Sequence, residues 1–193
     1  MQDAIKSIFQ ESIRVKEQTL KDNLSQIIKA VEEIIKVFQN NGKIFFMGNG
    51  GSAADSQHIA AEFIGLFQKK RRSLPAIALT TDTSILTALG NDYGYEVIFS
   101  RQLEGLGKKG DIVVGISTSG NSKNVIAGVK KAKALGIKSI SLTGCKGGKL
   151  AELCDINLIV PSNKTARIQE SHICIAHSIC ELVENQFSDN RNG

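Results

Sequence analysis

Residues 43–63 read KIFFMGNGGSAADSQHIAAEF, and this stretch indicates the fold. Its apolar start, Lys43–Met47, has the length and composition of a buried strand, and a helical pattern begins at Ser52. The glycine-rich loop Gly48–Ser52 joins the two. A strand, a tight loop and a helix in this order are typical of α/β proteins built on a parallel sheet.

Four more short apolar runs follow along the chain, and helical stretches separate them. The further expected strands are residues 76–79, 111–116, 139–142 and 157–160. The expected helices are residues 52–66, 83–89, 95–106, 122–135 and 165–187, with a short one after Gly147-Gly148. Short, continuously apolar strands that alternate with helices predict a parallel sheet covered on both faces.

Apolar residues spaced three and four apart precede the first strand. They predict two helices, over residues 3–20 and 23–40, the second ended by Asn41-Gly42. The sequence therefore predicts one domain over residues 1–193, with N-terminal helices over about 1–41 and an α/β core over about 42–187. The expected fold class is α/β, a three-layer α-β-α sandwich with a five-stranded parallel sheet.

Composition is that of an ordinary globular domain, with 41% hydrophobic and 22% charged residues. No apolar run approaches the roughly 18–20 residues that span a bilayer, so no membrane partner is expected. The N-terminus carries Asp3 and Glu11 and lacks the apolar block of a secretory signal. The four cysteines form no C-x-x-C pair, which favours reduced thiols. A cytoplasmic location is the expectation.

The net charge of +5 raises nucleic acid as a partner class. The positive residues are scattered, however, and the dense run Lys69–Arg72 has no interleaved aromatic residues for stacking on bases. We interpret this run as a solvated loop and expect no nucleic-acid partner. The charge is better suited to a mild attraction for anionic substrates.

Two loops at expected strand ends are candidate ligand sites, because open parallel sheets bind ligands outside the carboxyl ends of their strands. The loop at residues 117–122 reads STSGNS and directly precedes a helix. Backbone N–H groups at a helix N-terminus favour a phosphate, and hydroxyls add neutral donors. The candidates are Ser117, Thr118, Ser119 and Ser122. The alternative interpretation is a turn with an N-cap residue.

The first loop satisfies the relaxed dinucleotide fingerprint, Gly48-x-Gly50-x-x-Ala53. That fingerprint also requires an acidic residue about 20 positions on. The acidic residue at the end of the next strand, Asp82, lies 34 positions past Gly48, which argues against a dehydrogenase. A Walker A lysine is also missing, so no nucleotide cofactor is expected.

Acid–base and metal-ligating side chains occur on two expected helices. His58 and Glu62 are four residues apart and therefore share a helix face. The last helix carries Gln169, Glu170, His172 and His177, the last of these among apolar neighbours. Spacing alone leaves two alternatives open: polar residues on solvated faces, or a core histidine with one hydrogen-bond partner.

The order of these motifs resembles that of the phosphoheptose isomerases of the sugar isomerase (SIS) domain superfamily. The resemblance rests on GNGGSAADSQHIAAEF (48–63) after its strand, PAIALTTD (75–82), GNDYG (90–94), GDIVVGISTSGNSKNV (110–125), SLTGCKGGKLAELCD (141–155) and ARIQESHICIAHSICELVE (166–184). It implies an aldose–ketose isomerase that converts D-sedoheptulose 7-phosphate to D-glycero-D-manno-heptose 7-phosphate. That product belongs to bacterial surface heptose synthesis.

The resemblance also implies roles for individual residues. Ser117, Thr118, Ser119 and Ser122 would hold the phosphate. Asn49, Gly50, Gly51, Ser52, Asn91, Asp92 and Gln169, together with Glu62, would contact the substrate. Glu62 and His177 would be the catalytic acid–base pair, and His58, Glu62, Gln169 and His177 would bind zinc. The protein would be a homotetramer.

The chemistry of the residues agrees with this resemblance. Moving a carbonyl from C2 to C1 needs a base that removes the adjacent proton and a group that moves protons between the oxygens. A carboxylate and a histidine can do both, and zinc would polarise the carbonyl. In a straight helix Gln169 and His177 are about 12 Å apart along the axis and about 80° apart around it. For both to bind one zinc ion, the helix would have to bend, both side chains would have to be fully extended, or the ligands would have to come from two subunits.

Two other functions share the expected fold. One is a non-catalytic SIS-domain protein that binds a replication initiator, a type in which the catalytic carboxylate and histidine are replaced. Glu62 and His177 are both present here, which favours the enzyme. The other is a sensor of sugar phosphates, which turnover of sedoheptulose 7-phosphate would exclude.

The N-terminal segment predicts an oligomer. Its apolar stripe, Ile5, Ile8, Phe9 and Ile13, precedes the α/β core and must pack on its own domain or on a neighbour. Dihedral tetramers are a common way to bury such stripes.

Overall fold

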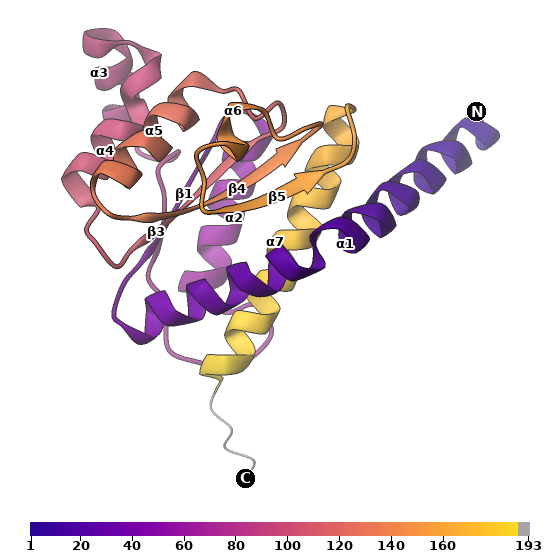
Figure 1. The fold of residues 1–193 in the computed structure, drawn as a ribbon, viewed down its shortest axis with the longest axis horizontal. Coiled ribbons are helices and arrows are strands. Elements are labelled where there is room, and N and C mark those ends of the chain that lie inside the picture. The colour runs from indigo at the N-terminus through magenta and orange to yellow at the C-terminus, as the bar shows by residue number, and fades with distance from the viewer. Residues whose placement is uncertain (189–193) are drawn as a thin grey trace.

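Five parallel strands form one sheet in the order β2-β1-β3-β4-β5 (Figure 1). The computed structural model describes residues 1–188. The strands are β1 (Ile44–Gly48), β2 (Ala76–Ala78), β3 (Ile112–Ser117), β4 (Lys138–Gly144) and β5 (Ile156–Val160). Each lies within two residues of its predicted position, so the predicted five-stranded parallel sheet is confirmed.

Helices cover both faces of the sheet, as predicted. They are α1 (Gln2–Gln39), α2 (Gly51–Ile64), α3 (Thr83–Tyr93), α4 (Ile98–Leu106), α5 (Lys123–Ala134), α6 (Gly148–Ala151) and α7 (Thr165–Phe187), with a 3-10 turn at Tyr95–Val97. Alternate strand residues enter separate cores: Ile44 and Phe46 pack with α1, α2 and α7, whereas Phe45 and Met47 pack with α4 and α5. The result is the three-layer sandwich.

The prediction of two N-terminal helices is wrong, because α1 is one continuous helix of 38 residues. Residues 1–39 contain no glycine or proline that could break it. The polar residues at the expected break instead dock the helix: the Asn23 amide donates to the Ile159 carbonyl (3.0 Å) and accepts from the Ile159 N–H (2.8 Å). Asn23 thus joins the middle of α1 to β5.

Only the second half of α1 packs over the sheet, and its first half extends past the body of the molecule (Figure 1). None of the helices within residues 1–188 is both long and apolar enough to cross a bilayer.

Candidate active site

The loops that follow β1 and β3 lie side by side at the carboxyl edge of the sheet. β1 and β3 are neighbours in register, with Gly48 opposite Ile116. The chain leaves β1 toward β2 on one side and leaves β3 toward β4 on the other. Such a switch point is where open α/β sheets bind ligands, so the topology places both predicted loops at the expected site.

The first loop presents its backbone to open space. Gly50 has φ +56°, and no described atom lies within 4 Å of the position that a Cβ would take. Asn49 is fixed across the switch point, because its side chain and that of Asn124 exchange hydrogen bonds of 2.9 and 2.8 Å. Tyr95 Oη also donates to Asn49 Oδ1 (3.2 Å). Ser52 is buried in the first turn of α2.

Asn124 and Tyr95 were not foreseen as part of this site. Asn124 follows the hydroxyl-rich loop by only two residues, a signal that could have drawn attention to it. Tyr95 belongs to a separate turn, and only the fold brings it to Asn49.

The second loop, residues 117–122, gathers its hydroxyls at the start of α5. Ser117 Oγ and Ser122 Oγ lie 2.8 Å apart, and the Gly120 N–H donates to the Ser117 carbonyl (3.0 Å). Ser122 occupies the N-cap position of α5, yet its side chain makes no capping hydrogen bond to the described helix. Helix capping by Ser122 therefore does not explain these hydroxyls, whereas the positive end of the helix dipole beside them is chemically suited to a phosphate.

A third loop, after β4, holds the second loop in place. The Gly144 N–H donates to the Thr118 carbonyl and the Leu150 N–H donates to the Gly120 carbonyl, both at 3.0 Å. The Lys149 N–H donates to Asn121 Oδ1 (3.1 Å). Sequence reasoning placed a short helix here but did not foresee this supporting role.

Two predicted site histidines, from different helices, meet at one point. His58 Nε2 of α2 lies 2.9 Å from His177 Nε2 of α7, and Glu62 Oε1 lies 3.5 Å from His58 Nε2. His177 is half-buried and its ring contacts Phe67, with centroids 5.3 Å apart. A carboxylate beside two imidazoles can exchange protons with a sugar carbonyl and its neighbouring carbon.

Asp55 is a further carboxylate near this cluster that sequence reasoning missed. Its spacing of three from His58 places both on one face of α2, and this was the available signal. Burial raises the pKa of Asp55, while the nearby His58 and His177 oppose that rise. Its Oδ2 atom is buried and has no hydrogen-bond partner among residues 1–188.

The other candidates on α7 divide between the site and the core. Gln169 lies against Gly51, two turns before His177, and a side chain at Gly51 would collide with the Gln169 amide.

Glu170 and His172 have structural roles. Glu170 pairs with Arg167, and its carboxylate accepts a hydrogen bond from the Ser12 hydroxyl of α1 (2.7 Å). His172 is a core residue: burial lowers its pKa to about 4, and its Nε2 donates to the Thr143 carbonyl (3.1 Å).

Asn91 and Asp92 are exposed near the end of α3. Asn91 Nδ2 donates to Asp92 Oδ1 (2.8 Å). Helix α3 packs on the 3-10 turn and on α4, at the rim of the molecule (Figure 1). The structure thus places Gln169 against the first loop at Gly51, and the His58–His177 pair about two turns farther along α2 and α7. Asn91 and Asp92 hydrogen-bond to each other on α3.

The chain is similar to known proteins over most of its length. The SIS domain family profile matches residues 8–144. The chain is 54% identical to the phosphoheptose isomerase of Aneurinibacillus thermoaerophilus, covering 99% of this chain and 98% of that protein. It is 55% identical to that of Aquifex aeolicus, with 98% and 99% covered. Among solved structures it resembles phosphoheptose isomerase GmhA from Neisseria gonorrhoeae, with TM-score 0.90, 48% identity and 95% and 98% covered.

Proposed function

The chain belongs to the SIS-domain family and, within it, to the phosphoheptose isomerases, and we propose that it converts D-sedoheptulose 7-phosphate to D-glycero-D-manno-heptose 7-phosphate. It is an enzyme, an aldose–ketose isomerase. The observation that carries the substrate assignment is the pairing of a hydroxyl-lined helix N-terminus with a Glu–His cluster on neighbouring elements. We place the reaction in bacterial surface heptose synthesis.

The reaction divides between the two parts of the site. The loop of residues 117–122 holds the phosphate, which leaves the other end of the sugar free to reach α2 and α7. Glu62 removes a proton from C1 of the ketose, which gives an enediol, and the proton returns at C2. His177 moves protons between the oxygens on C1 and C2. No step needs a nucleotide.

An NMR assay of the purified protein in D2O with several ketose phosphates tests this function. The expected result is aldose formation from sedoheptulose 7-phosphate, with solvent deuterium at C2 of the product because the enediol exchanges its proton. Shorter ketose phosphates should react more slowly. A protein that turns over none of them would contradict the proposal and would favour a sugar-phosphate sensor.

Replacing Ser119 by alanine should weaken binding of the phosphorylated sugar. Ser119 is exposed in the loop, and its hydroxyl would contact the charged phosphate in both ground and transition states. Loss of such a hydrogen bond costs about 1–3 kcal/mol, so KM should rise roughly tenfold with little change in kcat. Steady-state kinetics measure this, with Ser100→Ala on α4 as the control. An unchanged KM, together with silent Ser117 and Thr118 variants, would place the phosphate elsewhere.

Zinc is the proposed cofactor on the basis of donor chemistry. Two imidazole nitrogens and a carboxylate, from His58, His177 and Glu62, suit Zn²⁺. Within the described part of the chain, however, no three His, Cys, Asp or Glu side chains are already arranged as a metal site. Gln169 lies two turns away along α7, so these three side chains are the proposed core of the site. A bound Zn²⁺ would polarise the substrate carbonyl.

Exhaustive chelation should therefore lower activity, and added Zn²⁺ should restore it. Elemental analysis would show bound zinc in the wild type and less in a His58→Ala variant. Full activity in a preparation shown to be metal-free would leave Glu62 and His177 acting by acid–base chemistry alone.

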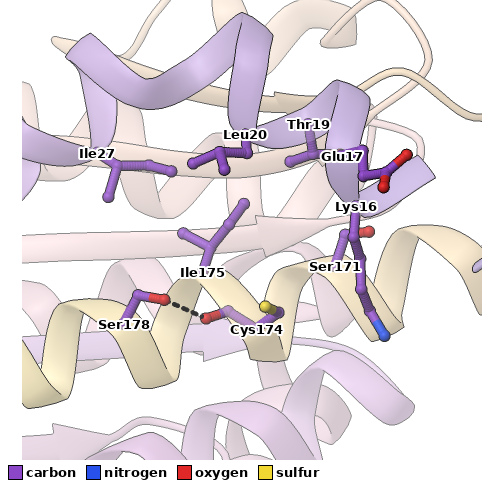
Figure 2. Close-up of a pocket in the computed structure, with 9 residues that line it drawn as sticks. All are labelled: Lys16, Glu17, Thr19, Leu20, Ile27, Ser171, Cys174, Ile175 and Ser178. Carbon is purple, nitrogen blue, oxygen red and sulfur yellow. Dashed lines mark hydrogen bonds between the residues drawn. The ribbon is translucent and has the colours of Figure 1, made fainter. Parts of the chain in front are cut away.

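A homotetramer is the proposed assembly. The apolar stripe of α1 remains exposed in the single chain, with Ile5, Ile8, Phe9 and Ile13 each at least half exposed. A groove of about 310 Å³ lies between α1 and α7, beside the exposed Leu20 (Figure 2). Packing of a second copy against α1 would bury both features.

Native mass spectrometry should show about four times 20.8 kDa for the wild type. The double variant Phe9→Asp, Ile13→Asp places charges in the proposed contact and should dissociate the assembly. A monomeric, fully active wild type would contradict the tetramer.

A further inference from the structure

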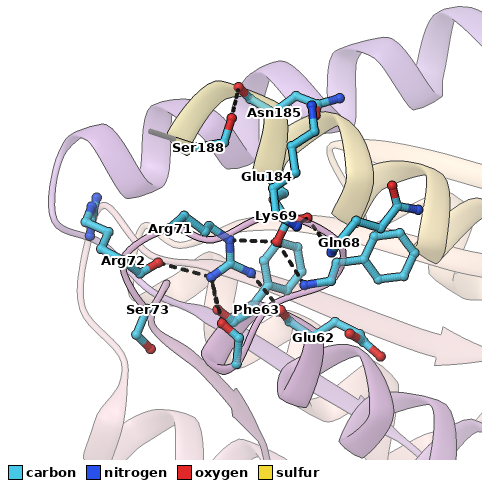
Figure 3. Close-up of polar contacts among 12 residues, drawn as sticks. Glu62, Phe63, Gln68, Lys69, Arg71, Arg72, Ser73, Glu184, Asn185 and Ser188 are labelled. Carbon is cyan, nitrogen blue, oxygen red and sulfur yellow. Dashed lines mark hydrogen bonds and ion pairs between the residues drawn. The ribbon is translucent and has the colours of Figure 1, made fainter. Parts of the chain in front are cut away.

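One arginine of the basic run Lys69–Arg72 is buried, contrary to the solvated loop expected for this run. The Arg71 side chain is 1% exposed, whereas Lys69, Lys70 and Arg72 are exposed. Arg71 lies at the C-terminal end of α2 and faces Glu184 of α7 (Figure 3). A buried guanidinium needs partners, and those of Arg71 belong to α2, to α7 and to the loop between residues 65 and 72.

Arg71 caps the C-terminus of α2. Its Nη2 donates to the carbonyl of Glu62 (2.7 Å), and its Nη1 donates to the carbonyls of Phe63 (2.9 Å) and Gly65 (3.1 Å). The last carbonyls of a helix lack partners within it, and a cation there also complements the helix dipole. The backbone of Glu62 itself is therefore held by Arg71.

Glu184 holds the other side of the same loop. Its carboxylate accepts the backbone N–H groups of Phe67 (2.8 Å), Gln68 (2.6 Å) and Lys69 (2.8 Å), and Arg71 Nε lies 3.2 Å from Oε1. Burial raises the pKa of Glu184, but the three N–H donors and Arg71 outweigh it, so the net pKa is lowered. Glu184 thus remains a carboxylate, two turns after His177 on α7.

The loop held in this way carries Phe67 onto the His177 ring. We propose that the Arg71–Glu184 pair is a positioning unit for the isomerase, which fixes Glu62 of α2 relative to His177 of α7 through the loop at residues 65–72. This inference rests on the proposed roles of Glu62 and His177. A buried ion pair adds little stability over an apolar pair, but its many directional hydrogen bonds define geometry, and a shift of about 1 Å can slow a reaction by 10²-fold.

Glu184→Gln tests the positioning role, because it keeps the shape but removes the charge. Asp111→Asn is a matched control, because Asp111 is also buried, accepts the N–H groups of Lys43 (3.0 Å) and Lys108 (2.9 Å) and pairs with Lys43 Nζ (2.8 Å). Unlike the partners of Glu184, these partners belong to neither α2 nor the loop at residues 65–72. Kinetics are measured at a temperature where circular dichroism shows both variants folded. We expect kcat of Glu184→Gln to fall on the order of tenfold with KM unchanged, and Asp111→Asn to keep wild-type kcat.

A spectroscopic readout separates this inference from the proposed function. The chain has three histidines, so isotope-labelled histidine gives three assignable ring signals. Glu184→Gln should shift the His177 signal, through the displaced Phe67 ring, and leave the His172 signal in place. Phe67→Leu should do the same if Glu184→Gln fails to fold. A Glu184→Gln variant with an unshifted His177 signal and wild-type kcat would overturn the positioning role. A wild-type protein without turnover would instead overturn the proposed function.

Discussion

Replacing Glu62 by glutamine should lower kcat by at least about 10²-fold while substrate binding persists. Glutamine keeps the shape and hydrogen-bonding capacity of the side chain but cannot accept the proton from C1. Glu62 lies on the face of α2 that His58 shares, within 3.5 Å of its Nε2, so the carboxylate belongs to the cluster that His177 completes. In the proposed mechanism the same carboxylate removes the proton from C1 and returns it at C2, so both half-reactions should slow.

Two measurements check this result. Steady-state kinetics give kcat and KM, and NMR in D2O follows exchange of the C1 proton, which should slow in parallel with turnover. Glu181→Gln makes the same charge change at an exposed position of α7 and serves as the control. Since Glu62 is also a proposed zinc ligand, metal content is measured for each protein. A Glu62→Gln variant that retains near wild-type kcat would remove Glu62 from the mechanism.

The fold could be predicted in most respects from local patterns. Continuous apolar runs of four to six residues are a strong signal for buried parallel strands, and all five lie where expected. The error at α1 has a clear origin. Polar residues around Asn23 interrupt the apolar pattern, but their partner is β5, 136 residues away, and no local pattern contains that contact.

The site was predictable where its residues share a loop or a helix. The hydroxyls of residues 117–122 and the His58–Glu62 face follow from spacing alone. The Asn49–Asn124 amide pair and the Arg71–Glu184 pair do not, because each joins side chains 75 or more residues apart. The prediction that Arg71 is solvated is wrong for the same reason. A basic run in a loop is ordinarily solvated, and only the fold brings Glu184 into contact with Arg71.

Replacing Gly120 by alanine should disrupt the loop at residues 117–122 more than removal of any one of its hydroxyl groups. Gly120 has φ +66°, a left-handed conformation that costs a residue with a Cβ about 1–2 kcal/mol. An added Cβ would also overlap the Gly147 carbonyl and lie 2.9 Å from the Gly148 nitrogen. Both obstacles are backbone atoms, so no side-chain rotation can relieve them.

The strain must then move the loop at residues 117–122 away from the loop that follows β4. The Gly120 carbonyl accepts the Leu150 N–H, and its N–H donates to Ser117, so displacement of Gly120 also disturbs the hydroxyl cluster. We expect a loss of stability of about 2–4 kcal/mol and a KM raised at least about tenfold. Thermal unfolding at fixed protein concentration and steady-state kinetics measure the two effects. In the control Gly105→Ala, on α4, the new Cβ meets no described atom within 4 Å, so stability should hold or rise by about 0.5–1 kcal/mol. Equal melting temperatures and KM values for both variants would show that the contact between the second and third loops does not shape the phosphate site.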